Sequence, residues 1–278
     1  MLVSVIIPAR DASATLGEQL DALARQDYGG EWEVVIADNG SRDGTKELAT
    51  RYADRFGRLT VVDASRAAGS ASARNDGVRE ARGEVLAFCD ADDVVDSHWL
   101  SALVDATEKH PLVAGTVRLH MGSEREPIEE DRDAQLDFLP FADTCSMAVH
   151  RAVYDKVGGF DESFIRCSDK VFSWRAHLAG YEMAVVEDAI VNKRQRGNRP
   201  RRMAQLYRWA AGEPRLFANF AEHGMPRSGT GRALADHALI VIALPFLWLP
   251  PIRAWWRSRA PLRAGRLVGS LAVRRRYL

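Results

Sequence analysis

Short apolar runs alternate with polar, partly amphipathic segments over roughly the first ninety residues of the chain. The apolar runs are rich in Val and Ile, which predicts buried strands, and the segments between them carry helical spacing or helix-stop signals. Four strands are predicted, at Val3–Ile7, Trp32–Ala37, Leu59–Val62 and Val85–Cys89. The intervening helices are predicted around Leu16–Leu23, from Thr45 to about Arg55, and at Ser70–Arg82. This alternation favours an α/β fold with a doubly wound, mostly parallel sheet flanked by helices.

The pattern loosens after Leu103. Further strands are predicted at Leu112–Met121 and Ser146–His150, and further helices at Asp169–Leu178 and Arg199–Phe220. The segment Glu124–Asp137 is acidic and without periodicity, which predicts a mobile loop. We therefore expect a main domain over residues 1–222 and a basic, apolar helical tail over residues 223–278.

The net charge of zero conceals two oppositely charged halves. Residues 193–278 carry 18 Lys/Arg and 3 Asp/Glu, a net charge of +15, and residues 1–192 carry the opposite net charge. A basic tail on an acidic body predicts contact with an anionic partner such as membrane headgroups or a lipid phosphate. The alternative is an Arg-rich helix face that is simply solvated.

The tail also contains sixteen consecutive uncharged residues, His237–Ile252, interrupted by three prolines. A membrane-spanning helix needs ~20 apolar residues, so the run is too short. Trp255, Trp256 and several Arg follow it, a composition typical of an interfacial or re-entrant anchor. The alternative is a helix packed on the main domain, or on a second subunit in a homodimer.

Cysteine usage and the first residues bear on the cellular compartment. Cys89, Cys145 and Cys167 are odd in number and widely spaced, so neither a disulfide framework nor a zinc site is indicated. The start at Met1 has no basic leader or cleavage site, so the apolar run after it is interpreted as a strand. We expect a cytoplasmic protein, at the inner face of the plasma membrane if the tail contacts lipid.

Three carboxylates stand directly after the fourth strand, in Asp90-Ala91-Asp92-Asp93. Carboxylates so close together repel one another, and a divalent cation relieves that repulsion. Hard oxygen ligands suit Mg²⁺ or Mn²⁺, with substrate phosphates completing the coordination. The alternative is an acidic turn that caps a helix near Ser97.

Other polar residues could contribute to a site, and each has a structural alternative. The Asp38-Asn39-Gly40-Ser41 segment could hydrogen-bond a nucleobase edge or simply form a turn. Arg74 could reach a diphosphate or be solvated. Asp169 could act as a general base or cap a helix. The seven histidines show no metal-ligand spacing.

Several motifs, in this order and spacing, resemble the family 2 inverting glycosyltransferases with the GT-A fold, a Rossmann-like sheet flanked by helices. The resemblance covers about Val3 to Phe217. Its motifs are Val5-Ile6-Ile7-Pro8, Asp38 to Thr45, Ala73-Arg74-Asn75-Asp76-Gly77, Phe88 to Asp93, Gly158 to Glu162, and Ser168-Asp169 leading to Trp174–Tyr181.

The resemblance implies roles for the donor-binding residues. Pro8, Ala9 and Arg10 would border the nucleobase and ribose of a nucleoside-diphosphate-sugar, and Asp38 and Asn39 would face the base.

The resemblance also implies the metal and the chemistry. Asp90 and Asp92 match the DxD motif, with Asp92 as a ligand of Mn²⁺ or Mg²⁺ and Asp90 as a ribose or metal contact. Asp169 matches the base that activates the acceptor hydroxyl.

Three positions depart from the family pattern. Ser168 precedes the base where Glu is usual, and Asn39 stands where uridine-using relatives often have Asp. Lys193 occupies the region where many members carry His, so it could neutralise the diphosphate directly instead of binding a metal.

The expected function is therefore transfer of a sugar, with inversion, to a saccharide, lipid-linked or natural-product hydroxyl, and no nucleic-acid partner is expected. One alternative is a polyprenyl-phosphate glycosyltransferase, which would need little from Asp169. Another is a non-catalytic nucleotide-sugar-binding or scaffold protein. A nucleotidyltransferase is disfavoured, because no Gly-rich triphosphate loop follows the first strand. The donor sugar, its base, the acceptor and the linkage are left open.

Overall fold

The computed structural model describes residues 1–121, 124–127, 138–164, 166–194, 199–227 and 238–273. The chain forms two compact units, one of residues 1–135 and 139–195, the other of residues 136–138 and 196–278. The sequence pattern places the domain boundary after residue 222, whereas the compact units divide after Gln195. The difference arises because the long helix α7 (Arg199–Phe220) packs against helix α9 (Pro250–Ala272).

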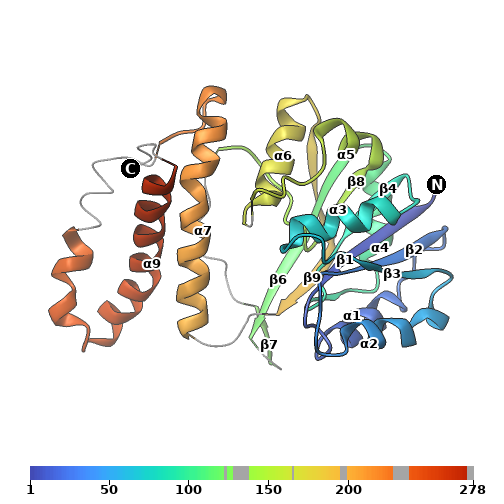
Figure 1. Cartoon of the computed structure of the whole chain (residues 1–278), viewed down its shortest axis with the longest axis horizontal. Coiled ribbons are helices and arrows are strands. Elements are labelled where there is room, and N and C mark those ends of the chain that lie inside the picture. The colour runs from blue at the N-terminus through green and yellow to red at the C-terminus, as the bar shows by residue number, and fades with distance from the viewer. Residues whose placement is uncertain (122–123, 128–137, 165, 195–198, 228–237, 274–278) are drawn as a thin grey trace. The chain divides into compact units, whose positions relative to one another are not determined.

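The first unit is built on one mixed sheet with the strand order β3-β2-β1-β4-β8-β6-β9-β5, and β7 pairs with β6 (Figure 1). The strands are β1 Val3–Ala9, β2 Trp32–Asp38, β3 Leu59–Asp63, β4 Val85–Phe88, β5 Val94–Val95, β6 Leu112–Met121, β7 Glu124–Pro127, β8 Met147–His150 and β9 Met183–Arg194. Strands β1 to β4 are mutually parallel, β8 runs antiparallel between β4 and β6, and β9 is parallel to β6. The predicted α/β class with a mostly parallel sheet is confirmed.

Helices connect and cover these strands. In the first unit they are α1 Leu16–Leu23, α2 Thr45–Arg51, the short η1 Ala53–Arg55, α3 Ser70–Glu80, α4 Trp99–Thr107, α5 Arg151–Val157 and α6 Ser168–Leu178. In the second unit α7 and α9 are joined by η3 Ala221–His223 and η4 Leu244–Phe246 among the described residues. The predicted C-terminal helical extension is therefore present.

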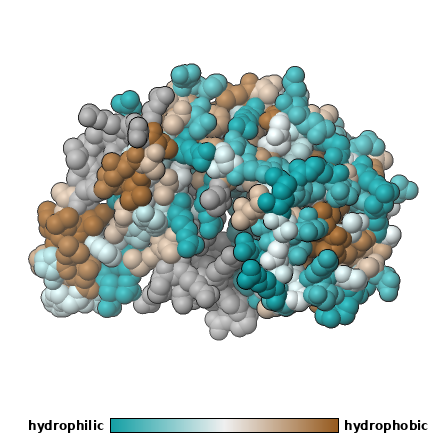
Figure 2. Space-filling model, in the orientation of Figure 1, coloured by the Kyte–Doolittle hydropathy of each residue, from teal (hydrophilic) through white to brown (hydrophobic). Residues whose placement is uncertain are grey.

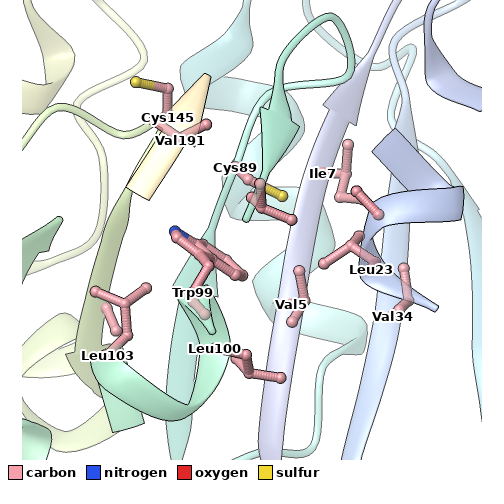
Figure 3. Packing of buried hydrophobic residues seen from close by; sticks show 14 of the residues in the cluster. Val5, Ile7, Leu23, Val34, Cys89, Trp99, Leu100, Leu103, Cys145 and Val191 are labelled. Atoms are coloured by element: carbon pink, nitrogen blue, oxygen red, sulfur yellow. The ribbon is translucent and has the colours of Figure 1, made fainter. Parts of the chain in front are cut away.

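Alternate side chains of β1 serve opposite faces of the sheet, as a strand covered on both sides requires. Val5 and Ile7 belong to a core cluster with Trp99 and its neighbours on α4, and Ile6 belongs to a second cluster on the other face. Figure 3 shows Trp99, Leu100 and Leu103 of α4 in the first of these clusters. The indole nitrogen of Trp99 donates a hydrogen bond of 2.9 Å to Ser146 Oγ, so the buried polar atom is satisfied.

The prediction of a mobile loop over Glu124–Asp137 is wrong for the first four residues. Glu124–Pro127 forms strand β7, which pairs antiparallel with the end of β6. Backbone pairing therefore orders this segment although its side chains have no apolar periodicity. Residues 128–137 lie outside the described residues.

Among the residues that the structure describes, no helix combines the length and the apolar character needed to cross a membrane.

Candidate active site

The carboxyl ends of β1, β2 and β4 meet at one edge of the sheet, because these strands are parallel neighbours. Ala9 ends β1 and Asp38 ends β2, and Asn39 N donates a hydrogen bond of 2.8 Å to the Ala9 carbonyl. Asp90 follows β4 by two residues. Ligands of open α/β sheets bind at this edge, so the fold brings the predicted donor-binding segments together.

The loops after β1 and β2 are fastened to each other by hydrogen bonds. Ala12 N donates to Thr45 Oγ1 at 2.8 Å, Asp11 N donates to Ser41 Oγ at 3.0 Å, and the Asp43 carboxylate accepts from Ser13 N at 3.0 Å. Hydrogen bonds from the Thr45 hydroxyl first, and then from the backbone nitrogens of Ser13 and Thr45, lower the pKa of Asp43 to about 2. The two loops therefore form one continuous rim.

The residues expected around the nucleoside differ in exposure. Arg10 is exposed, Pro8 is half-buried and Ala9 is buried at the end of β1. Asp38 is 9% exposed and accepts a hydrogen bond of 3.2 Å from Ser41 N. Arg10 and Asp38 are thus on the same rim, one free to turn toward a ligand and the other fixed.

The Asn39 side chain is hydrogen-bonded to the protein backbone. Its amide nitrogen donates to the carbonyl oxygens of Ala64 at 2.5 Å and Ala67 at 2.8 Å, and its amide oxygen accepts from Gly69 N at 3.1 Å. The side chain therefore holds the loop between β3 and α3. Contact between Asn39 and a nucleobase stays a prediction, and both amide hydrogens are already engaged.

Arg74 lies inside the site. Its side chain is 5% exposed and its Nη2 donates to Asp90 Oδ1 at 2.6 Å, which excludes the interpretation as a solvated surface residue. Helix α3 reaches this position by close approach to the sheet, since a Cβ on Gly77 would lie 2.7 Å from Ile6 Cγ2. Glycine in the middle of this helix is explained by that contact.

The carboxylates after β4 form a dense negative cluster. Asp93 is 2% exposed, its Oδ1 accepts from Arg194 N at 3.1 Å, and its Oδ2 is buried with no hydrogen-bond partner among the described residues. Burial first, and then the charges of Asp90 and Asp92, raise the pKa of Asp93 to about 8. A buried carboxylate oxygen without a hydrogen-bond partner thus lies beside two further carboxylates. A divalent cation bound here would relieve the repulsion between their negative charges.

The cluster suits a cation that shares its coordination with a substrate. Among the described residues no three His, Cys, Asp or Glu side chains are arranged to enclose a metal. Mg²⁺ commonly takes one or two carboxylates, with water and substrate phosphates filling the other positions. Asp90 and Asp92 fit that incomplete type of site.

Lys193 approaches the cluster from β9. Its Nζ lies 3.0 Å from Asp143 Oδ2 and 3.4 Å from Cys145 Sγ. Burial disfavours the ammonium, but Asp143 and the carboxylates after β4 outweigh it and raise the pKa of Lys193 well above its usual range. Lys193 is therefore a cation at this edge of the sheet.

Asp143 is a site residue that the sequence analysis missed. It lies four residues before β8, and β8 is antiparallel to β4 with Met147 opposite Phe88. Residues that precede β8 therefore lie at the same edge as residues that follow β4. Burial opposes ionisation of Asp143, yet Lys193 keeps its pKa below the usual range. No local sequence pattern reports the antiparallel pairing of β8 that brings Asp143 to this edge.

Asp169 stands in the first turn of α6, after Cys167 in a left-handed conformation with φ 64°. Its Oδ1 accepts a hydrogen bond of 2.8 Å from Lys170 N. Burial and the negative charge of Asp143 raise the pKa of Asp169. A half-buried carboxylate with raised pKa is a suitable proton acceptor.

Two further motifs hold the site together. Asn75 donates to the Phe160 carbonyl at 2.8 Å and to Glu162 Oε1 at 3.0 Å, and its oxygen accepts from Phe160 N at 3.0 Å. Arg66 binds both Glu162 oxygens at 2.7 and 2.9 Å. These contacts fix α3, which carries Arg74, against the loop that precedes α6.

Comparison with solved structures assigns the fold to the GT-A type. The mannosyltransferase PcManGT from Pyrobaculum calidifontis, in complex with GDP-Man and Mn²⁺, has a TM-score of 0.70 at 21% identity, covering 96% of this chain and 86% of that chain. S. aureus TarS 1–349 in complex with UDP-GlcNAc has a TM-score of 0.58 at 16% identity, covering 100% of this chain and 93% of that one.

The sequence profile described as glycosyl transferase family 2 matches residues 4–175, and the chain belongs to this family. Glycosyltransferase AglE of Haloferax volcanii is 31% identical over an alignment of 198 residues that covers 68% of this chain and 65% of the relative. Validoxylamine A glucosyltransferase of Streptomyces hygroscopicus subsp. limoneus is 28% identical over 229 residues, 68% of this chain and 50% of the relative. The chain thus spans half to two thirds of these relatives.

Proposed function

We propose that this protein transfers a sugar from a nucleoside-diphosphate-sugar to an acceptor hydroxyl, with inversion at the anomeric carbon. The observation that carries the proposal is the meeting of carboxylates with the buried Arg74 and the half-buried Lys193 at one sheet edge. Asp90, Asp92 and Asp93 follow β4, Arg74 contacts Asp90, and Lys193 lies among the same charges. Membership of glycosyl transferase family 2 supports the same chemistry.

The donor diphosphate would bind beside the carboxylates after β4. Asp92 and Asp90 would hold Mn²⁺ or Mg²⁺, which when bound supplies positive charge for the leaving diphosphate. Pro8, Ala9 and Arg10 would border the nucleoside, with Asp38 and Asn39 near the base. PcManGT was solved with GDP-Man and TarS with UDP-GlcNAc, so guanosine and uridine donors are the first to test.

Asp169 would act as the general base. Its carboxylate takes the proton of the acceptor hydroxyl as the acceptor oxygen attacks the anomeric carbon, and the bond from that carbon to the diphosphate oxygen breaks. The raised pKa of Asp169 makes it a better proton acceptor than an ordinary aspartate. Lys193 and Arg74 would remain beside the departing diphosphate and stabilise its charge.

The test is release of nucleoside diphosphate by the full chain from UDP-, GDP- and dTDP-sugars, each with Mn²⁺, Mg²⁺ or EDTA. We expect metal-dependent release from one donor, lost in Asp92→Ala and retained in Asp155→Asn, a control at an exposed aspartate of α5. Release that persists in EDTA would remove the metal from the proposal. Absence of both release and donor binding would refute it.

A second candidate is transfer to a polyprenyl phosphate, favoured by the 18 Lys/Arg among residues 193–278. One relative, WfgD of Escherichia coli, is named as a beta-1,3-glucosyltransferase acting on GlcNAc-diphosphoundecaprenol and is 32% identical over 93 residues, covering 34% of this chain. A β-1,3 linkage is made to a sugar hydroxyl, so this relative supports a lipid-linked hydroxyl acceptor and not a phosphate nucleophile. A phosphate nucleophile carries no proton that must be removed. Asp169→Asn should therefore lower kcat about 10²- to 10⁴-fold for a hydroxyl acceptor and little for a phosphate acceptor.

The non-catalytic alternative has its own signature. A scaffold or nucleotide-sugar-binding protein would bind the donor, in calorimetry, without releasing nucleoside diphosphate in the presence of any acceptor.

A further inference from the structure

One face of α9 packs against α7 within the second unit. A Cβ on Gly265 would lie 2.3 Å from the Tyr207 carbonyl oxygen, and one on Gly269 would lie 2.3 Å from the Ala211 carbonyl oxygen. Small residues four apart therefore let the two backbones touch. This contact explains why α7 and α9 form a closely packed pair.

The segment that precedes α9 is exposed as far as the described part of the chain shows. Within residues 238–249, here called the apolar segment, six large apolar side chains are exposed. They are Leu239 49%, Val241 63%, Ile242 61%, Leu244 49%, Phe246 47% and Trp248 73%. Figure 2 shows brown surface over this part of the chain, which Figure 1 draws in orange-red. Contiguous exposed apolar surface of this kind marks an interaction site.

The apolar segment has a defined attachment. Trp256 Nε1 of α9 donates a hydrogen bond of 3.2 Å to the Ile240 carbonyl, and Pro250 opens α9 directly after the segment. The segment carries no charged residue, whereas α9 brings Arg253 to the exposed surface and Arg257 and Arg259 to half-buried positions. Apolar side chains thus stand next to Arg253 and Arg257, which lie one helical turn apart on α9.

We propose that residues 238–259 dock this protein onto an anionic lipid surface, with the apolar segment entering the headgroup region and the arginines meeting lipid phosphates. Apolar anchors beside basic side chains are the composition of interfacial membrane-binding elements. Residues 193–278 carry a net charge of +15, which complements an anionic bilayer. This inference does not depend on the proposed sugar transfer.

A second copy of the chain fits this surface less well. In a two-fold symmetric dimer the same patch of both subunits meets, so the basic tail of one copy would face that of the other. Like charges brought together in this way repel. The charge pattern therefore favours lipid over self-association.

The test is flotation of the full chain with phosphatidylcholine vesicles that contain or lack about 30% phosphatidylglycerol. We expect binding to the anionic vesicles at about 0.1 M NaCl and a several-fold loss at about 0.5 M NaCl, because salt screens the arginines. Val241→Ser together with Trp248→Ser should weaken binding at least about tenfold, since each substitution removes an exposed apolar side chain that the headgroup region would bury.

The matched control is Val185→Ser on β9, because Val185 is 65% exposed and Val241 is 63% exposed. It should leave vesicle binding unchanged, and circular dichroism should show that all variants are folded. Absence of binding to anionic vesicles would overturn the proposal, as would equal weakening by Val185→Ser. A dimer in light scattering that Val241→Ser with Trp248→Ser dissociates, without vesicle binding, would assign the surface to a second copy instead.

Discussion

The ion pair between Arg74 and Asp90 allows a quantitative test of the site. Arg74→Met removes the guanidinium and keeps the length of the side chain, while Asp90→Asn removes the carboxylate charge. The two side chains lie 2.6 Å apart and are 5% and 26% exposed. A double-mutant cycle with both single variants and the double variant isolates their interaction from other effects.

The expected coupling energy is about 2 kcal/mol. Two unit charges about 4 Å apart attract by about 4 kcal/mol at an effective dielectric constant of about 20. Part of this attraction is offset because Arg74 is withdrawn from water, and part is screened because Asp90 is a quarter exposed. Arg74→Met alone should cost more, about 3 kcal/mol, because it leaves Asp90 beside Asp92 and Asp93 without a neighbouring guanidinium.

The assay is urea unfolding followed by the fluorescence of the buried Trp99 and Trp174, both in the first unit. The same cycle at the exposed pair of Arg55 and Asp21 serves as the control and should show little coupling. A coupling energy between Arg74 and Asp90 below about 0.5 kcal/mol, no larger than that of a surface pair, would refute the assignment of Arg74 to the interior of the site.

Further predictions concern the proton acceptor, the packing of α3 and the response to acid and chelators. Asp143→Asn should move the acid limb of the kcat–pH profile to lower pH, because the negative charge of Asp143 contributes to the raised pKa of Asp169; an unmoved limb would contradict this. Gly77→Ala should destabilise the protein by about 1 kcal/mol in urea unfolding through overpacking, whereas Gly57→Ala, where a Cβ meets nothing within 4 Å, should not. The pKa of Asp43 is lower in the folded protein than in the unfolded chain, so its stabilising effect is present above about pH 4 and is lost as the pH falls toward about 2. Asp43→Asn should accordingly flatten the dependence of the melting temperature on pH in that range. Chelation by EDTA should abolish nucleoside diphosphate release, and added Mn²⁺ or Mg²⁺ should restore it.

Strands β1, β2 and β4 were predictable because each is a compact apolar run, buried on both faces of a parallel sheet. Strand β3 lies at the edge of the sheet and is only half-buried, but its Leu59–Val62 run is still recognisable. Strand β9 gave a much weaker signal. Its twelve residues include Glu187, Asp188, Lys193 and Arg194, and few of its positions are fully buried. What holds β9 in the sheet is long-range pairing with β6, which no local pattern reports. The seven-residue helix α5 is too short to show periodicity.

In the candidate site, too, some residues could be predicted from local sequence patterns and others could not. Asp90 and Asp92 could be found because they follow a recognisable strand directly, and helical spacing already placed Arg74 on a helix. Asp143 could not be found, since its position depends on the antiparallel direction of β8. The sequence also could not indicate that the side chains of Asn39 and Asn75 form hydrogen bonds with the backbone of neighbouring loops. Hydrogen-bond partners far apart in the chain are decided by tertiary structure.

The position of β9 has a consequence for the order in which a growing chain can assemble. Strand β9 lies between β6 and β5, yet it is synthesised after both, and it carries Lys193. Once β8 has joined β4, a nascent chain on the ribosome would therefore hold β6 beside β8 with its other edge unpaired until residue 194 has emerged. Unpaired strand edges favour aggregation. Translation that stalls or stops before Met183 should thus yield a chain that lacks the last cation of its site and is prone to associate through β6.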